Sequence, residues 1–285
     1  MLALIENKYD IKNKEFVARP FIKWAGGKRQ LINELIKAMP VDYNRYYEPF
    51  IGGGALFFAI RPDNAFISDI NPELINVYNL IKNDVDSLIK DLRKYENTEE
   101  HFYDIRNLDR KPSYKKLSKI KKASRFIYLN KTCYNGLYRT NSEGQFNVPF
   151  GFYKNPNIVD EHNLRLVAEL LKKTEIVLSP FTGIEDKVKS RDFVYLDPPY
   201  MPISKTSSFT KYYRDDFGID AQFELKEFCD KITKKGVYFL LSNSYSDLIL
   251  DLYKNYNIKK IKAIRAINCK ADKRGSITEL IIANY

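Results

Sequence analysis

The sequence has few of the residues from which metal sites and disulfide frameworks are built. Its 285 residues include three cysteines and two histidines, and no C-x-x-C pair. The cysteines lie far apart, so their spacing matches no zinc-binding pattern. We therefore expect no metal site, and reduced thiols as in a cytosolic protein. The residues concerned are Cys133, Cys229, Cys269, His101 and His162.

Targeting and membrane-spanning segments are missing as well. The N-terminal run Met1–Glu6 becomes charged too early for a signal peptide. No apolar run approaches the length that crosses a bilayer. We expect a soluble, cytoplasmic protein that contacts no membrane.

Two phosphate-binding patterns are incomplete. Gly52-Gly53-Gly54 lacks the spacing of the G-x-G-x-x-G dinucleotide fingerprint. Gly27-Lys28 has no glycine five residues before it, and no Ser or Thr follows the lysine. The sequence therefore excludes a P-loop, and a turn before a helix, with Trp24 in the core, is the simpler interpretation of this cluster.

Basic residues are in excess over acidic ones. The chain has 47 Lys and Arg against 36 Asp and Glu, a net charge of +11, and a pI near 9.2. Such a surplus favours a polyanionic partner such as DNA or RNA. A compositional bias is the alternative explanation, because the chain is rich in Lys, Ile and Asn.

The pattern along the chain predicts an α/β fold split by an insertion. Helix and strand alternate up to residue 71 and again from residue 162, whereas the region between is helical and highly charged. The last two strands follow each other without a helix, as an antiparallel edge pair does. Strands are expected at Tyr46–Phe50, Ala65–Asp69, Glu175–Leu178, Phe193–Leu196, Val237–Ser242, Ile258–Ala266 and Ile277–Ala283.

These seven strands make a Rossmann-like mixed sheet. The predicted division is a first catalytic segment, 1–71, an inserted segment, 72–161, and a second catalytic segment, 162–285. Within the insertion, Leu137–Val148 is typical of a β-hairpin with a Gly-containing turn. Helices are expected at Lys28–Met39, Ala55–Ile60, Leu74–Ile81, Val85–Tyr95, Lys115–Leu129, Leu164–Lys172, Gln222–Lys234 and Asp247–Tyr253.

The tetrapeptide Asp197-Pro198-Pro199-Tyr200 follows a buried strand. Ligands of open α/β sheets bind at the carboxyl ends of strands. A carboxylate, proline carbonyls and an aromatic ring suit a planar amine, because they offer two acceptors and a stacking face. A simple strand stop is the alternative interpretation of the tetrapeptide alone.

The glycine turn and the next strand end indicate a nucleoside cofactor. Glycines at Gly52–Gly54 let the backbone approach a ligand closely. Asp69 ends the next strand, where an acidic side chain can bind both ribose hydroxyls. The alternative is that Asp69–Asn71 caps the helix that starts at Pro72.

Taken in order, these motifs resemble the Dam-type DNA adenine methyltransferases, alpha-class enzymes that use S-adenosylmethionine. The motifs are Lys23–Lys28, Glu48–Gly54, Ser68–Asn71 and Asp197–Tyr200, and Asn135–Gly151 is similar to the family's recognition hairpin. The resemblance covers nearly the whole chain after about the first fifteen residues. It is closest to the Dam and DpnM-like branch, which methylates adenine in GATC. It implies the S-adenosylmethionine-dependent methyltransferase fold with an inserted DNA-recognition domain.

The resemblance also implies a role for particular residues. It implies that the target adenine is bound by Asp197, Pro198 and Tyr200. It implies that S-adenosylmethionine is the cofactor, that S-adenosylhomocysteine is the product and that no metal takes part; the cofactor would be bound by Trp24, Lys28, Phe50, Gly52, Gly54, Asp69 and Asp197. It implies that double-stranded DNA is bound by Lys23, Tyr134, Asn135, Leu137, Arg139, Pro149 and Tyr153. The third glycine of the Gly52–Gly54 turn departs from the family pattern.

The chemistry suggests how these residues act. Adenine N6 is a poor nucleophile and is inaccessible inside a duplex, so the base must be flipped out. Asp197 and the Pro198 carbonyl would accept the amino hydrogens while Tyr200 stacks on the ring. Whether Asp197 takes the proton stays open. Arg139 fits the O6 and N7 acceptors of guanine or a phosphate, and Tyr134 is either a wedge in the base stack or a packing residue.

Several alternatives remain at this point. One alternative is methylation of cytosine N4, which requires the same hydrogen-bond acceptors. The non-enzyme alternative is a catalytically inactive, DNA-binding relative. The lysines from Lys115 to Lys122 either follow phosphates or form a solvated face. The sequence leaves open whether the protein acts alone or together with a cognate restriction endonuclease that acts on the same site without binding this chain. It also leaves open whether the protein is a monomer or a weak dimer.

Overall fold

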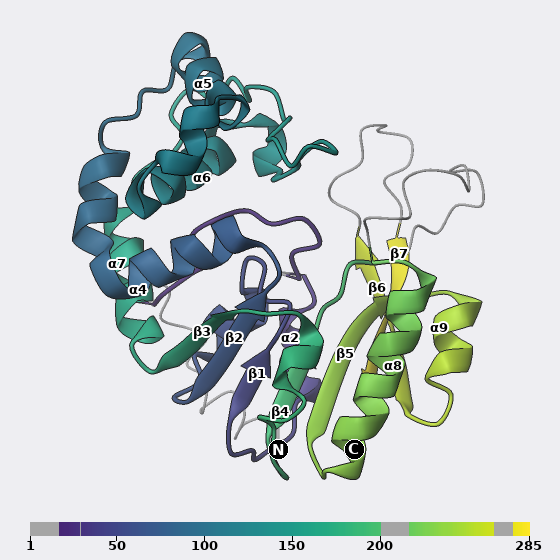
Figure 1. Cartoon of the computed structure of the whole chain (residues 1–285). Coiled ribbons are helices and arrows are strands. Elements are labelled where there is room, and N and C mark those ends of the chain that lie inside the picture. The colour runs from purple at the N-terminus through teal and green to yellow at the C-terminus, as the bar shows by residue number, and fades with distance from the viewer. Residues whose placement is uncertain (1–16, 29, 201–216, 265–275) are drawn as a thin grey trace.

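The computed structural model describes residues 17–28, 30–200, 217–264 and 276–285 (Figure 1). The expectations for Met1–Glu6 and Cys269, and the last two residues of the strand predicted at Ile258–Ala266, lie outside the described residues.

Seven strands form one mixed sheet in the order β3-β2-β1-β4-β5-β7-β6. The first five strands of the chain pair in parallel, and β7 runs antiparallel between β5 and β6. The predicted sheet and its antiparallel final pair are confirmed. The strands are β1 (Tyr46–Glu48), β2 (Ala65–Asp69), β3 (Thr174–Leu178), β4 (Phe193–Leu196), β5 (Tyr238–Ser244), β6 (Asn257–Ile264) and β7 (Ser276–Ala283).

Strand order reverses between β1 and β4, which creates a topological switch point. Strand β1 pairs with β2 on one side and with β4 on the other. In open α/β sheets the crevice beyond the carboxyl ends at such a point is where ligands bind. The segments that follow β1, β2 and β4 therefore lie at the predicted site.

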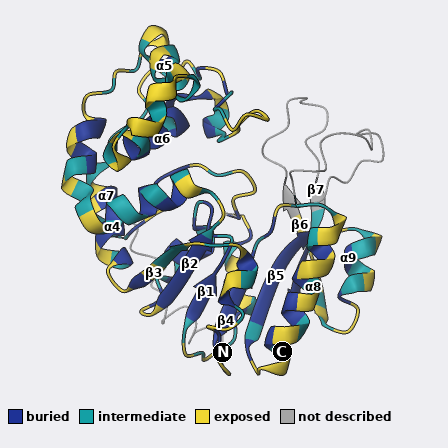
Figure 2. Ribbon diagram, in the orientation of Figure 1, coloured by how far each residue is buried: buried dark blue, intermediate teal, exposed yellow. Residues whose placement is uncertain are grey.

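The central strands β1, β4 and β5 are buried on both faces, whereas the edge strands β3 and β6 are partly exposed (Figure 2). Because side chains alternate along a strand, Tyr46 faces the core that lies under α2, α3, α4 and α7, and Tyr47 faces the core under α8 and α9. The helices in the described part of the chain are α2 (Ile32–Ala38), α3 (Ala55–Ile60), α4 (Pro72–Leu92), α5 (Glu99–Arg106), α6 (Lys119–Thr132), α7 (Glu161–Leu171), α8 (Ile219–Lys234) and α9 (Asp247–Leu252).

Some helix predictions need correction. The pair predicted at 74–81 and 85–95 corresponds to the two parts of α4, which are separated by a kink at the non-helical Asp84 (φ −154°, ψ 56°). Helix α5 was not predicted. Helix α6 begins at Lys119 rather than Lys115, because Ser118 caps it and η2 (Pro112–Lys116) forms a separate 3₁₀ turn.

Residues 93–160 form a helical lobe beside the carboxyl ends of the strands (Figure 1). The lobe has a small core of its own, centred on Phe102, Tyr128, Phe146 and Phe150. Helix α4 connects it to the sheet, because α4 packs against both α6 and α7 and buries its apolar face in the sheet core. The lobe is thus anchored above the switch point.

The predicted hairpin at 137–148 is only partly formed. Its ladder is reduced to one isolated bridge, between Thr140 and Phe146. The bonds of the turn remain, since the Asn141 N–H donates to the Gln145 carbonyl and the Asn147 N–H donates to the Arg139 carbonyl. The segment is therefore an arm with a tight turn rather than a pair of regular strands.

Candidate active site

The structure brings Lys28, Asp197 and Tyr200 together at the end of β4. The Lys28 ammonium lies 2.8 Å from Asp197 Oδ1 and 4.4 Å from the centroid of the Tyr200 ring. Its third contact is a 2.7 Å hydrogen bond to the Gly26 carbonyl. With 5% of its surface exposed, Lys28 is a buried cation whose charge is matched by one carboxylate.

The charge state of Asp197 depends on opposing causes. Burial raises the pKa of this carboxyl above its ordinary value, and the negative charge of Glu279 raises it further. The ammonium of Lys28 acts in the opposite direction, through charge and a hydrogen bond, and lowers the pKa. Lys28 therefore favours the ionised form of Asp197, which is the form that accepts hydrogen bonds.

Tyr200 is fixed by a residue of β7, a strand that is separated from β4 by β5 alone. Its hydroxyl donates to Glu279 Oε2 at 2.9 Å, and Glu279 lies on β7, where it pairs with Ser244 of β5. Beside it, Pro198 is buried and Pro199 is exposed. The ring of Tyr200 thus has a defined orientation next to the Asp197 carboxylate.

The glycine turn after β1 packs against Trp24. Gly52 has φ 45°, and a Cβ built on it would lie 2.5 Å from Trp24 Cδ1, so no larger residue fits. The Gly52 carbonyl accepts a 3.0 Å hydrogen bond from the buried Tyr78 hydroxyl. Gly54, at φ 66°, is the N-cap residue directly before α3. Backbone and indole are therefore held together at the end of β1.

Asp69 joins this turn from the end of β2. One oxygen accepts the Gly52 N–H at 3.1 Å, and the other accepts the Asn71 N–H at 3.0 Å. The helix cap is Asn71, whose side chain accepts from the Glu73 and Leu74 N–H groups, so capping does not account for Asp69. Burial raises the pKa of the Asp69 carboxyl, and its backbone donors lower it.

The residues at this edge of the sheet fit a nucleoside cofactor. A carboxylate has about four lone-pair positions, so Asp69 can accept ribose hydroxyls in addition to its two backbone donors. Phe50 supplies an apolar wall nearby: it is half-buried and stacks on Phe181 at 5.4 Å with an interplanar angle of 25°. Phe50 belongs to the core under α8, apart from the Trp24 cluster.

Glu48 is a buried group to which the sequence motifs gave no separate role. It is 2% exposed and accepts a 2.6 Å hydrogen bond from the Tyr46 hydroxyl. Burial raises its pKa to about 8, and the negative charge of Asp197 adds to the effect. Its place at the end of β1, directly before Pro49, was the available signal in the sequence.

Lys23 connects the sheet to the lobe. Its backbone N–H donates to Asn130 Oδ1 at 2.9 Å, and its carbonyl accepts from Asn130 Nδ2 at 2.8 Å. The ammonium of Lys23 lies 5.2 Å from the centroid of the Tyr153 ring. Asn130, buried on α6, was missed because this pairing spans 107 residues of sequence.

The other residues predicted to bind DNA lie in two segments of the lobe, 134–139 and 149–153, which pair through their backbones. Tyr134 is 52% exposed and donates its backbone N–H to the Pro149 carbonyl at 2.9 Å, and Pro149 is exposed. Asn135 has a left-handed backbone at φ 57°. Leu137 differs from them because it is half-buried against the lobe core.

Arg139 lies on the arm, with its side chain exposed. Its Nε donates to Asn147 Oδ1 at 2.8 Å across the turn. This bond fixes the direction of the guanidinium and leaves its two Nη groups for other acceptors. Arg139 therefore lies exposed on the arm, whereas Asp197 follows β4.

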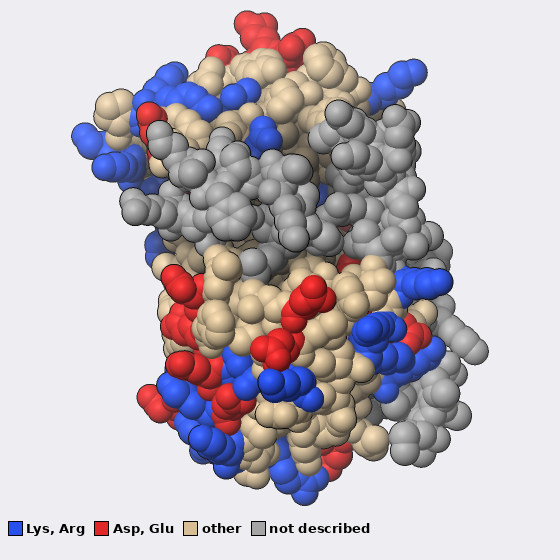
Figure 3. Space-filling view, turned by 90° about the vertical axis from the view of Figure 1, so that its right-hand side faces the viewer, with Lys and Arg blue, Asp and Glu red and all other residues tan. Residues whose placement is uncertain are grey.

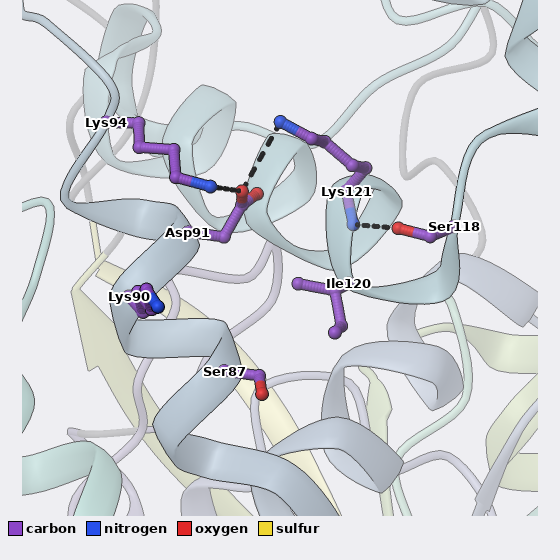
Figure 4. Close-up of a pocket in the computed structure, with 7 residues that line it drawn as sticks. All are labelled: Ser87, Lys90, Asp91, Lys94, Ser118, Ile120 and Lys121. Atoms are coloured by element: carbon purple, nitrogen blue, oxygen red, sulfur yellow. Dashed lines mark hydrogen bonds and ion pairs between the residues drawn. The ribbon is translucent and has the colours of Figure 1, made fainter.

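The lysines of α6 are partly engaged within the protein. A hollow of about 250 Å³ lies between α4 and α6. Figure 4 shows the side chains that line it, among which the Asp91 carboxylate pairs with the ammonium groups of Lys94 at 2.8 Å and Lys121 at 3.3 Å. These cations lower the pKa of the Asp91 carboxyl against its burial. Lys122 covers the Tyr114 ring at 5.3 Å. Two of the five lysines from Lys115 to Lys122 thus make structural contacts.

Two further observations concern the part of the chain that the structure describes. No group of three His, Cys, Asp or Glu side chains in it is arranged to hold a metal ion. None of its helices combines the length and the apolar character needed to cross a membrane.

The sheet topology, with a glycine turn after β1, Asp69 at the end of β2 and Asp197 directly after β4, defines an α/β protein of the Rossmann-like methyltransferase class. The chain belongs to the D12 class N6 adenine-specific DNA methyltransferase family, whose model matches residues 24–267. This membership confirms the expected enzyme class, an adenine-specific DNA methyltransferase.

Relatives are similar over nearly their whole length. The type II methyltransferase M1.LlaDCHI of Lactococcus lactis subsp. cremoris is 45% identical, covering 94% of this chain and 95% of the relative. The type II methyltransferase M.MjaIII of Methanocaldococcus jannaschii is also 45% identical, covering 94% and 99%. The DNA adenine methylase of Haemophilus influenzae is 34% identical, covering 92% of each.

Proposed function

We propose that this protein transfers a methyl group from S-adenosylmethionine to N6 of an adenine flipped out of double-stranded DNA, within GATC. The observation that carries the proposal is the half-buried Asp197 carboxylate, paired with the buried Lys28 beside the Tyr200 ring, at the switch point that also holds the Gly52 and Asp69 turn. A carboxylate and a ring suit a planar amine, and the turn suits a nucleoside.

The cofactor site consists of residues from three segments. Asp69 would accept the ribose hydroxyls, while Gly52 and Gly54 let the backbone approach and Phe50 and Trp24 supply apolar walls. S-adenosylmethionine supplies the activated methyl group when bound. Lys28 stabilises the negative charge of Asp197 at the boundary between this site and the adenine pocket.

The remaining residues act on the target base. Asp197 and the Pro198 carbonyl accept the two amino hydrogens, which raises electron density on a nitrogen whose lone pair is delocalised into the ring. Tyr200, held by Glu279, stacks on the base. Positioning of the nucleophile contributes much of the rate acceleration.

The lobe would read the DNA. We propose residues 72–161 as the target-recognition domain inserted between the catalytic segments 1–71 and 162–285. Helix α4 connects this domain to the sheet. Arg139 contacts guanine, because its fork matches O6 and N7. Lys23, Asn135, Leu137, Pro149 and Tyr153 make further contacts, and Tyr134 fills the space left by the flipped adenine.

The names of the relatives support a proposal for the biological setting. The names of two of them, at 45% identity, describe type II methyltransferases, which supports a modification enzyme paired with a restriction endonuclease that acts on the same site. The DNA adenine methylases in the comparison support the adenine target. We propose a cytoplasmic, DNA-associated enzyme that works as a monomer or weak dimer.

The test uses labelled S-adenosylmethionine and a plasmid free of adenine methylation. Chromatography of the digested nucleosides should show label only in N6-methyladenine, and base-resolved mapping should place it at GATC. Label in N4-methylcytosine would establish the alternative reaction. Absence of transfer, with DNA binding intact, would establish the inactive relative.

A further inference from the structure

One aromatic side chain of the lobe combines strain with exposure. Phe152 has φ 52°, in the left-handed region that bulky residues avoid, and 69% of its surface is exposed. The described residues contain four such non-glycine positions. Arg61 and Arg191 lie in turns that lead into β2 and β4, at the end of the sheet away from the site, whereas Asn135 and Phe152 lie on the lobe.

The neighbouring backbone imposes this conformation. The Gly151 N–H donates to the Thr132 carbonyl at 2.8 Å, and Phe150 bridges with Cys133. On the other side, the Tyr153 carbonyl accepts from Asn97 Nδ2 at 2.7 Å. With both flanks fixed, the residue between them cannot relax, which is the condition under which strained residues persist.

Packing within the protein does not explain the Phe152 ring. It touches Phe150 edge-on, with ring centroids 5.0 Å apart and an interplanar angle of 69°. In a continued strand it would follow Phe150 onto the buried side, but at φ 52° the strand ends and most of the ring faces water. An exposed aromatic held in a strained backbone indicates a contact with a partner.

The surroundings indicate which partner. Tyr134, itself 52% exposed, belongs to the segment that pairs with residues 149–151. The ammonium of Lys23 lies over the ring of Tyr153, and Lys154 is exposed. Exposed aromatic rings beside cations suit a nucleic acid, whose bases stack on the rings while its phosphates attract the charges.

We propose that Phe152 is a second base-stacking residue of the lobe, in addition to Tyr134, held outward by backbone strain so that its ring contacts double-stranded DNA. The proposal rests on the proposed function. It adds a DNA contact that the sequence motifs did not indicate.

The main variant is Phe152→Asn, because asparagine tolerates the left-handed conformation and removes the ring. Its dissociation constant for a duplex with one central GATC should rise about 5- to 150-fold, the range of one lost base–aromatic stack. Its melting temperature should equal or exceed that of the wild type, because asparagine relieves the backbone strain. Its affinity for S-adenosylmethionine, measured by calorimetry, should be no lower than that of the wild type. Phe152→Tyr, which keeps the ring, should bind DNA like the wild type.

Two control variants isolate the ring from general effects. Phe223→Leu alters an exposed phenylalanine of α8, and Arg61→Asn relieves the same kind of backbone strain away from the site. Both should bind DNA like the wild type. An unchanged DNA affinity in Phe152→Asn, or an equal loss in Phe152→Tyr, would overturn the proposal. A wild-type protein that neither binds nor methylates DNA would instead refute the proposed function.

Discussion

Lys28 controls the carboxylate on which the proposed chemistry depends. Asp197 is desolvated, with a pKa raised by burial, and Lys28 is the cause that lowers it. The two residues are 169 positions apart in sequence and meet at 2.8 Å. Such a pair sets the pH at which an ionised acceptor is available.

Replacing Lys28 with methionine should therefore move the acid limb of the pH–rate profile to higher pH. The pKa of Asp197 loses its lowering cause, so the carboxylate stays protonated over a wider range. The measurement is kcat against pH from 5 to 9 at saturating S-adenosylmethionine. Lys37→Met, which removes an exposed lysine of α2, is the matched control, and an acid limb that stays in place would contradict the assignment.

Glu48 gives rise to a second pH dependence, that of the free energy of unfolding. Its pKa is about 8 in the folded protein against an ordinary 4.5, so the folded state holds a proton that the unfolded state releases. The stabilisation is fully present below about pH 4.5 and is lost as the pH rises towards 8. Between pH 6 and pH 8, the free energy of unfolding should fall by about 2–3 kcal/mol through this group.

Glu48→Gln should remove that fall, because the neutral amide oxygen can still accept the Tyr46 hydroxyl. Urea unfolding of both proteins at pH 6 and pH 8 measures the difference. A variant whose stability falls with pH as steeply as that of the wild type would show that Glu48 is ionised in the folded state.

Residues within a local motif were predictable, whereas their distant partners were not. Asp69 and Asp197 each follow a buried strand, and chain order alone places them at one sheet edge. Glu279 reaches Tyr200 only because β7 inserts antiparallel beside β5, a register that no local pattern encodes. Position 152 is a phenylalanine rather than a glycine or an asparagine, so its residue type does not indicate a left-handed backbone. The conformation of Phe152 follows instead from the hydrogen bonds of its neighbours.

Among the elements, the lobe is organised around a buried acidic residue. Asp109 pairs with Arg125 at 2.6 Å and accepts the Phe146 N–H at 2.8 Å, while Arg110 donates to the Phe146 carbonyl at 2.6 Å. Thr140 and Phe146 form a non-hydrogen-bonded pair, because the bonds across the turn join Asn141 to Gln145 and Asn147 to Arg139. The backbone groups of Phe146 therefore point away from the partner segment, and Asp109 and Arg110 satisfy them.

Asp109→Ala should destabilise the protein by about 3–5 kcal/mol, because it leaves the 2%-exposed Arg125 as an uncompensated buried cation. Urea unfolding measures the change. Asp251→Ala breaks an exposed ion pair with Lys254 and should cost about 0–1 kcal/mol. A loss of stability as small for Asp109→Ala as for this control would mean that Asp109 does not support the lobe.

The arm carries the proposed sequence reader. Arg139→Ala should reduce discrimination between GATC and sites with a changed guanine by about 1–3 kcal/mol. Competition binding with duplexes that differ at one base pair measures it. Lys116→Ala, at an exposed lysine of η2, should weaken binding equally on every sequence, and the same uniform loss in Arg139→Ala would make that arginine a phosphate contact.

Over the whole molecule, the net charge of +11 is unevenly displayed. On the face with α8 and α9, acidic and basic side chains are interspersed over the described sheet domain, whereas basic side chains predominate on the described lobe below its acidic tip (Figure 3). Ion pairs such as Lys226–Asp230 and Lys231–Glu185 neutralise charge on the first region. The sequence alone predicted the surplus and left its location open.

The division of labour between sheet and lobe leads to the most direct test. If Asp197 performs the chemistry and the lobe binds DNA, Asp197→Ala should lose transfer while retaining affinity. We predict a fall in the single-turnover methylation rate of at least about 100-fold, the scale of one lost transition-state hydrogen bond, with a DNA dissociation constant close to that of the wild type. Asp186→Ala, at an exposed carboxylate, should change neither. Substantial methylation by Asp197→Ala would contradict the central claim.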